Sequence, residues 1–135
     1  MAITASIDTN VLVRLLITDD AQQTQVARKL LTQHVQRAET LFVPATVALE
    51  LEWVLRSRYR FGKTDVLSAF ATVMASVELE FESEEAMEQA LADYEDGSAD
   101  FADYLHLALA KKGRALPFWT FDAGASRAQG ARLLK

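Results

Sequence analysis

The sequence predicts an α/β fold, a three-layer α/β/α sandwich with a central, mainly parallel sheet of about four to five strands. Two patterns along the chain lead to this prediction. Short apolar runs of strand length alternate with longer stretches in which apolar residues recur at helical spacing. A helical stretch follows nearly every strand-like run, as parallel pairing requires. A third observation is that no linker, repeat or low-complexity tract divides the 135 residues, so we expect a single domain over residues 1–135.

Each predicted element has a local signal. The strand-like runs are short and apolar, and several end at an acid or a proline. Helices begin at a hydroxyl, an acid or Pro44, whose fixed φ suits a first turn, and end near glycine or basic residues. We expect Val26, Leu30 and Leu31 to be buried and the Ser83 hydroxyl to cap its helix. In chain order the signals predict a strand at 3–7, a helix after residue 10, a helix from 19 or 20 to about 38, a strand at 41–43, a helix from 44 to about 60, a helix from 64 to about 75, an edge strand at 77–81, a helix starting at 83, a helix at 100–112, a buried strand at 115–121 and an edge strand at 131–134.

Composition excludes several classes of protein. The absence of cysteine excludes a disulfide framework and every thiolate site, and His34 and His106 leave little material for a histidine-rich metal site. The net charge of -5 argues against a protein that holds nucleic acid mainly by neutralising phosphates. No apolar run approaches the roughly 18 residues of a membrane span, and the start of the sequence lacks a secretory signal. We therefore expect a soluble, cytoplasmic protein.

Two acids follow predicted strands. Asp8 comes directly after the first strand and Asp122 ends the last, Thr120-Phe121-Asp122. Ligand sites of open α/β sheets lie at the carboxyl ends of strands, so both side chains are candidates for a shared site. The structural alternatives are that Asp8 caps the following helix and that Asp122 forms a turn.

Glu50 is a third candidate because of its neighbours on the predicted helix 44–60. Val47, Trp53 and Val54 lie three or four positions away and form an apolar stripe, so we expect Glu50 to face the interior. A buried carboxylate needs an ion pair, hydrogen bonds or a metal, and Arg14 or Arg56 could supply the pair. We expect Glu52, two positions on, to be solvated.

The predicted helix 100–112 is apolar almost all round, but three polar residues interrupt it at steps of three. These are Asp100, Asp103 and His106, which should lie along one line of a nearly buried helix. Asp100 could instead cap the helix, and Asp103 could simply favour its positive end. His106 is more readily explained as a hydrogen-bonded packing residue than as a ligand.

The four acids Asp8, Glu50, Asp103 and Asp122 can converge from separate segments. Their mutual repulsion would then require a cation, and oxygen ligands favour Mg²⁺, with Mn²⁺ as a substitute. A metal held by few carboxylates acts on phosphate esters by activating water and neutralising charge.

Four segments in this order resemble PIN-domain ribonucleases and, more narrowly, VapC-like toxins of type II VapBC toxin–antitoxin modules. The segments are residues 7–14, 43–56, 100–108 and 120–122, which together span nearly the whole chain. The resemblance implies a PIN-like sandwich and a Mg²⁺-dependent endoribonuclease. It implies metal-binding acids at Asp8, Glu50 and Asp103, with Asp122 as the fourth, Asp100 as a secondary candidate, and Asn10 and Thr120 as supporting residues. It also implies an RNA substrate, with transfer and ribosomal RNA as candidates, a VapB-like antitoxin as inhibitor, and a homodimer.

The acidic balance does not exclude RNA, since the charge is unevenly distributed. Basic residues gather within residues 56–63, interleaved with Tyr59 and Phe61, where they could meet an RNA backbone and stack a base. A solvated helix end is the alternative. The RNA-binding candidates are Arg14, Arg56, Arg58, Arg60 and Lys63, and we expect RNA affinity to depend on the divalent ion.

Three other functions stay open at this point. A phosphotransferase of the haloacid-dehalogenase type also begins with an Asp after the first strand, but it needs an acid where this chain has Asn10. A PIN-fold interaction module could use its acids to bind a basic partner, because residues 64–110 contain no Lys or Arg. An RNA-processing nuclease outside a toxin–antitoxin system would carry the same site.

Overall fold

All the strand pairs described in residues 2–135 are parallel, and they form two separate sheets. A computed structural model describes these residues and divides the chain into two compact units, unit 1 (Met1–Glu82) and unit 2 (Ser83–Lys135). The five strands agree with the predicted α/β class with parallel pairing, three of them in unit 1 and two in unit 2.

In unit 1 the sheet has the order β1-β2-β3, so the second strand is central. Ser6 lies opposite Phe42, and Val43 lies opposite Phe81. Four helices accompany the sheet. The elements are β1 (Ala2–Ser6), α1 (Thr9–Leu16), α2 (Ala21–Gln36), β2 (Glu39–Val43), α3 (Ala45–Ser57), α4 (Lys63–Met74) and β3 (Leu79–Phe81). As predicted, β3 is an edge strand.

The core of unit 1 is built on the central strand. Leu41 and Val43 of β2 are fully buried, and they share this core with Leu12 of α1, Leu51 of α3 and Phe70 of α4. Both α2 and α3 contact α1, and α2 also contacts β2. This arrangement fixes the corner between β1 and α1, where Asp8 lies.

The prediction for α2 is wrong in one respect. Val26 is 66% exposed, whereas the buried positions of this helix are Thr24 and Ala27. The buried side chains of α2 are thus small, and the helix packs against both α1 and β2. Leu30 and Leu31 are half-buried.

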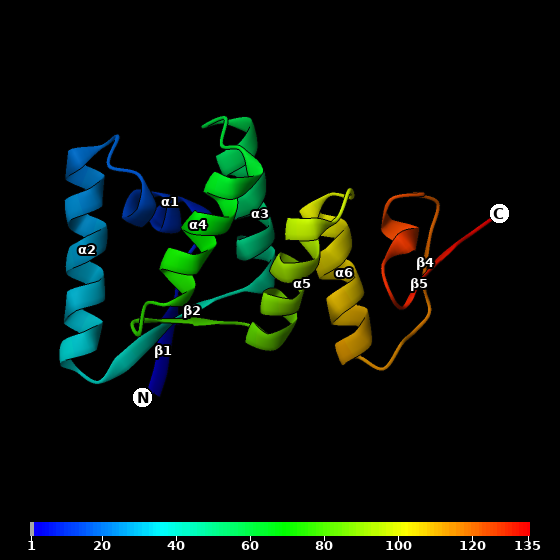
Figure 1. Ribbon diagram of the computed structural model, residues 1–135. Coiled ribbons are helices and arrows are strands. Elements are labelled where there is room, and N and C mark those ends of the chain that lie inside the picture. The colour runs from blue at the N-terminus through cyan, green and yellow to red at the C-terminus, as the bar shows by residue number, and fades with distance from the viewer. Residues whose placement is uncertain (1) are drawn as a thin grey trace. The chain divides into compact units, whose positions relative to one another are not determined.

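Unit 2 begins with two helices that pack side by side, α5 (Glu84–Asp96) and α6 (Phe101–Lys112) (Figure 1). The ring of Tyr94 in α5 meets the ring of Phe101 in α6 edge to face, and the two ring centroids are 5.7 Å apart. In the turn between the helices, the Tyr104 hydroxyl accepts a hydrogen bond from the backbone N–H of Ala99 at 3.1 Å. A Cβ on Gly97 would lie 1.8 Å from that hydroxyl, so glycine is required there.

The Ser83 hydroxyl does not cap α5, which corrects the prediction. Ser83 adopts a left-handed conformation with φ 54°, and its side chain makes no capping hydrogen bond. Its hydroxyl instead accepts a hydrogen bond from the Lys112 ammonium at 2.6 Å. The helix still begins where predicted, with Glu84 and Glu85 in its first turn.

The C-terminal strands are shorter than predicted. They are β4 (Phe118–Thr120) and β5 (Ala131–Leu133), joined through the short 3-10 helix η1 (Ala125–Arg127). The ladder starts after Pro117, which has no N–H to donate. The predicted burial of this strand is also wrong, because Phe121 is 78% exposed and Trp119 52%. Among residues 2–135, no helix combines the length and the apolar character that crossing a membrane requires.

Candidate active site

Asp8 occupies the corner between β1 and α1. The backbone N–H of Ile7 donates to the carbonyl of Phe42 at 3.1 Å, which keeps the chain beside β2 up to this point. Asp8 then caps α1, and its Oδ1 accepts a hydrogen bond from the N–H of Val11 at 3.1 Å. The Asp8 side chain is exposed, as is Asn10. The capping alternative is therefore confirmed for one oxygen of Asp8, and the carboxylate still faces solvent.

Thr9 is a residue that the sequence did not single out. It is only 4% exposed, and its hydroxyl donates a hydrogen bond to Oε1 of Glu50. Glu50 is thereby tied to the residue next to Asp8, although the two residues lie on different helices, α1 and α3. One sequence signal could have identified Thr9. It is a hydroxyl residue beside Asp8, and the next buried positions of the same helix, Leu12 and Val13, are apolar.

The predicted orientation of α3 is wrong. Glu50 is exposed and Glu52 is 2% exposed, the reverse of the expectation. The buried face consists of Ala48, Leu51 and Leu55, with Glu52 beside them, whereas Trp53 is 59% exposed. Glu52 is held by Arg56 of the same helix, with Nε 2.7 Å from Oε2 and Nη2 3.4 Å from Oε1. Arg56 therefore pairs with Glu52.

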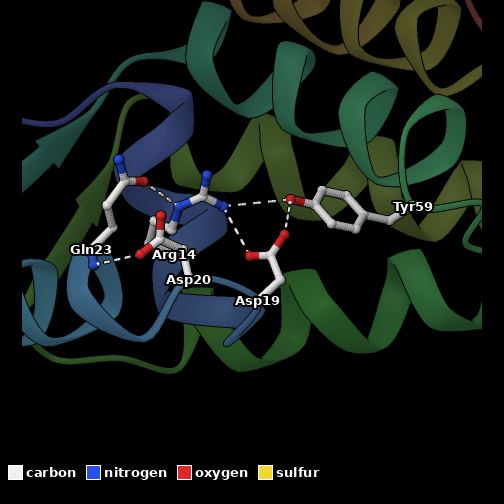
Figure 2. A network of polar contacts seen from close by, with 5 residues as sticks. All are labelled: Arg14, Asp19, Asp20, Gln23 and Tyr59. Atoms are coloured by element: carbon white, nitrogen blue, oxygen red, sulfur yellow. Dashed lines mark hydrogen bonds and ion pairs between the residues drawn. The ribbon is translucent and has the colours of Figure 1, made fainter.

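Arg14 is the centre of a polar network at the end of α1 (Figure 2). Its Nε donates to Oε1 of Gln23 at 2.5 Å, and its Nη1 lies 3.0 Å from Oδ1 of Asp19. The Tyr59 hydroxyl lies 3.5 Å from Nη1 and donates to Oδ2 of Asp19 at 2.9 Å. The hydrogen bond with Tyr59 and the nearby charge of Asp19 raise the pKa of Arg14 above its usual value. Arg14 is therefore engaged with Asp19 and not with Glu50.

In the predicted basic segment, Arg56, Arg58 and Arg60 are exposed and Lys63 is half-buried. The Tyr59 hydroxyl belongs to the Arg14 network, and its ring meets Phe61 edge to face with centroids 6.5 Å apart.

Unit 2 contributes three acids, of which Asp100 and Asp122 influence Asp103. Burial raises the pKa of Asp103 above its usual value, and the negative charges of Asp122 and Asp100 raise it further. A hydrogen bond with the backbone of Asp100 and the charge of His106 act in the opposite direction. Asp100 stands at the N-cap position of α6, but its side chain makes no capping hydrogen bond. The carboxylates of Asp100 and Asp122 thus lie near enough to Asp103 to repel its charge.

Asp122 is held by the loop that follows β4. Its Oδ1 accepts a hydrogen bond from the N–H of Ala125 at 2.8 Å, and its own N–H donates to the Thr120 hydroxyl at 3.0 Å. A Cβ on Gly124 would lie 3.1 Å from Oδ1 of Asp122 and 3.2 Å from the Ser98 hydroxyl. The Thr120 hydroxyl therefore supports Asp122 by accepting a hydrogen bond from its backbone N–H. Asp122 forms a turn, as the structural alternative expected, and its side chain is also exposed.

His106 is exposed and packs against Phe118, with ring centroids 6.4 Å apart and planes inclined by 38°. This contact agrees with a packing role, although the partner is a ring and not the expected hydrogen bond.

The candidate acids come from both units, Asp8 and Glu50 from unit 1 and Asp103 and Asp122 from unit 2. Within the described residues, no group of three His, Cys, Asp or Glu side chains is assembled that could hold a metal ion. The donor chemistry nevertheless fits a hard divalent cation, since every candidate offers carboxylate oxygens. Burial and the charges of Asp122 and Asp100 raise the pKa of Asp103, and a cation bound beside this carboxylate would act in the opposite direction.

Comparison with known proteins gives three results. No curated protein matches the sequence significantly. The crystal structure of Mycobacterium tuberculosis VapC20, described as a Sarcin-Ricin loop cleaving toxin, is similar with 19% sequence identity and a TM-score of 0.42, covering 94% of this chain and 96% of that one. The model of the PIN domain family, a family of nucleases, matches residues 5–131. That match confirms the resemblance to PIN domains and the PIN-like α/β fold class that the sequence predicts. The chain belongs to the PIN domain family.

Proposed function

We propose that this PIN domain is a Mg²⁺-dependent endoribonuclease and the VapC-like toxin of a type II toxin–antitoxin module. The observation that carries the proposal is the group of carboxylates in unit 2, where burial, followed by the charges of Asp122 and Asp100, raises the pKa of Asp103. A divalent cation that binds between such acids offsets the repulsion between their negative charges.

In this proposal Asp8 and Asp103 bind Mg²⁺, for which Mn²⁺ can substitute, and Asp122 completes the set with Asp100 as a secondary ligand. The bound cation would supply an activated water and neutralise charge on the phosphodiester. Glu50 orients the attacking water and is itself held by Thr9. Thr120 fixes the backbone of Asp122, and Asn10 follows Asp8 in the same corner. The joint action of the four acids rests on the sequence resemblance.

The proposed partners follow from the same resemblance. The substrate is RNA, with transfer and ribosomal RNA as candidates, and the inhibitor is a VapB-like antitoxin. The active form is a homodimer of single PIN domains in the cytoplasm. The basic side chains proposed to meet the RNA backbone are Arg14, Arg56, Arg58, Arg60 and Lys63, of which three, Arg56, Arg58 and Arg60, are exposed near the end of α3.

The test compares RNA cleavage by the full chain with that of D8N and D103N, with Mg²⁺ and with a chelator. Removal of either ligand should lower activity by more than about 100-fold, because even residues that only support a metal ligand contribute about 10- to 100-fold. E88Q removes an exposed acid of α5 and should cleave like the wild type. Equal activity of D8N and E88Q would refute the site assignment.

Two further measurements separate the alternatives. Calorimetric titration with Mn²⁺ should show binding to the wild type and not to D8N, whereas an interaction module would bind no ion at these acids. Expression in bacteria should arrest growth, and co-expression of the protein encoded by the adjacent small gene should relieve the arrest. A nuclease outside a toxin–antitoxin system would cleave RNA without either effect.

A further inference from the structure

Unit 1 contains a groove of about 670 Å³ between α1 and α2. Its lining includes Asp8 and Asn10 at the start of α1, Arg14 further along the same helix, and Gln23 and Val26 of α2. The groove is therefore continuous with the candidate metal ligand of this unit. An extended ligand bound at Asp8 could therefore continue along α1 and stay within the groove.

Arg14 is fixed in this groove by its neighbours. Its Nε and Nη1 are occupied by Gln23 and Asp19, and the Tyr59 hydroxyl holds both Arg14 and Asp19. Its side chain retains 20% exposure. A guanidinium held from two sides has already lost most of its rotational freedom, so a ligand that binds it meets a small entropic cost.

Two donor groups are left over by this arrangement. Nε and Nη1 are used in these contacts, and Nη2 of Arg14 has no hydrogen-bond partner within residues 2–135. Because Oε1 of Gln23 accepts from Arg14, the amide nitrogen of Gln23 is turned away from that contact and also has no partner in the described chain. Figure 2 shows both nitrogens turned away from the Asp19 carboxylate. Together they offer an acceptor a charged N–H group and a neutral one.

The charges of the groove decide how such an acceptor can bind. Asp8 and Asp20 also line it, and both carboxylates are already acceptors of backbone N–H groups. An anion in the groove would be repelled by both Asp8 and Asp20, and a divalent cation would neutralise the Asp8 carboxylate. Binding of an anion near Arg14 should therefore require the cation.

We infer that the α1–α2 groove binds a backbone phosphate of the RNA strand next to the scissile bond, with Arg14 and Gln23 as its donors. Asp19 and Tyr59 are positioning residues for Arg14, and Val26, which is 66% exposed, lies where a ribose or base can cover it. The inference rests on the proposed function, since it takes RNA as the substrate.

The first experiment leaves Arg14 and Gln23 unchanged. The full chain carrying E50Q, which retains Asp8 and Asp103 but should cleave slowly, is labelled with ¹⁵N and titrated with a ten-nucleotide oligouridylate in Mg²⁺. The side-chain signals of Arg14 Nε–H and the Gln23 amide should shift, while that of Gln33, an exposed residue of α2 outside the groove lining, should not. Omission of Mg²⁺ should abolish the shifts. If RNA binds without shifts at Arg14 and Gln23, the inference is overturned, and a protein segment becomes the remaining candidate for the groove.

The second experiment measures affinity for the same oligonucleotide by fluorescence anisotropy at several salt concentrations. R14Q should bind about tenfold more weakly, and the slope of log affinity against log salt should fall by about one. R14K keeps the charge but loses the planar fork, so it should stay several-fold weaker than the parent. R28Q removes an exposed charge of α2 outside the groove lining and should bind like the parent. Equal binding by R14Q and R28Q would refute the phosphate site.

These experiments separate the two proposals. If the wild type cleaves no RNA in Mg²⁺, the proposed function fails, wherever RNA binds. If it cleaves RNA and the KM of R14Q equals that of R28Q, the groove site fails and the nuclease stands. R14Q also breaks contacts with Asp19 and Gln23, so its melting temperature is measured first, and the labelled parent decides the question if the variant does not fold.

Discussion

The hydroxyl of Thr9 donates a hydrogen bond to the carboxylate of Glu50, which joins the buried start of α1 to an exposed acid of α3. Glu50 is long and solvent-exposed, so without this bond its carboxylate would sample several rotamers. Thr9 directly follows Asp8, and the bond therefore sets the position of one candidate catalytic acid relative to another within unit 1.

Replacement of Thr9 by Val should lower RNA cleavage while the fold remains intact. Val has the shape of Thr but no hydroxyl, so packing at this buried position is kept and only the bond to Glu50 is lost. We expect kcat to fall by about 10- to 100-fold, as for other residues that orient metal-site ligands, with little change in KM. T9S restores the hydroxyl and should recover most of the activity. A T9V enzyme with wild-type kcat and Mg²⁺ requirement would show that the bond has no part in the reaction.

The raised pKa of Asp103 makes stability depend on pH. Burial and the charges of Asp122 and Asp100 raise this pKa in the folded chain above its value in the unfolded chain. Between those two values the folded state binds more protons, so the free energy of unfolding decreases as pH rises through this window. The loss persists at neutral pH, and D103N should therefore melt at a higher temperature than the wild type at pH 7.

Thermal melts from pH 3 to pH 8 check this prediction. The difference between D103N and the wild type should shrink as pH falls, and Mg²⁺ should raise the melting temperature of the wild type more than that of D103N. E88Q, with the same change of charge on the exposed face of α5, should follow the wild type. A D103N melting temperature below that of the wild type at pH 7 would contradict the assigned repulsion.

Gly97 should tolerate no side chain. A Cβ there would lie 1.8 Å from the Tyr104 hydroxyl and 2.8 Å from the carbonyl oxygen of Asp93. Overpacking of this kind costs about 1 to 3 kcal/mol, and displacement of Tyr104 would also break its buried bond to Ala99. Urea denaturation should show a loss of stability of at least about 2 kcal/mol for G97A. G62A is the control, because its Cβ would come no closer than 3.9 Å to Asp65, and its stability should change by less than about 1 kcal/mol.

Arg56 should matter more for stability than Arg58. The Glu52 side chain is 3% exposed and pairs with Arg56, whose side chain is 45% exposed. R56Q would leave a buried carboxylate without that partner, at a cost of about 1 to 3 kcal/mol, less than for a pair buried on both sides. R58Q changes an exposed residue at the end of α3 and should cost no more than about 0.5 kcal/mol in the same denaturation experiment. Equal stability of the two variants would mean that water solvates the Glu52 carboxylate as well as Arg56 stabilises it.

The sequence was sufficient for the order of the elements and for the corner at Asp8. The run at 3–7 and the cap at Asp8 are local signals, and the structure has β1 at Ala2–Ser6 and α1 from Thr9. Family membership confirms the α/β fold that these signals predict.

The orientation of α3 could not be obtained in the same way. Its apolar residues surround the helix, because Leu51 and Leu55 define one face while Trp53 and Val54 lie on another. Periodicity then offers two faces, and the packing of α3 against α1 decides between them. The reversal of Glu50 and Glu52 follows from that single choice. The contact of Thr9 with Glu50 depends on the same packing and has no signal within either segment.

The parallel sheet of unit 1 also bears on how the chain folds during synthesis. Ala2 pairs with Glu39, and Leu41 pairs with Leu79, so two helices must be made before each pairing can close. Contacts between such distant segments form slowly, because the entropy of loop closure is lost before the pairing is gained. We therefore expect β1 to leave the ribosome with its backbone groups unpaired and to remain exposed to chaperones until β2 arrives. By contrast, α5 and α6 are neighbours in sequence and can pack together within one short stretch of translation.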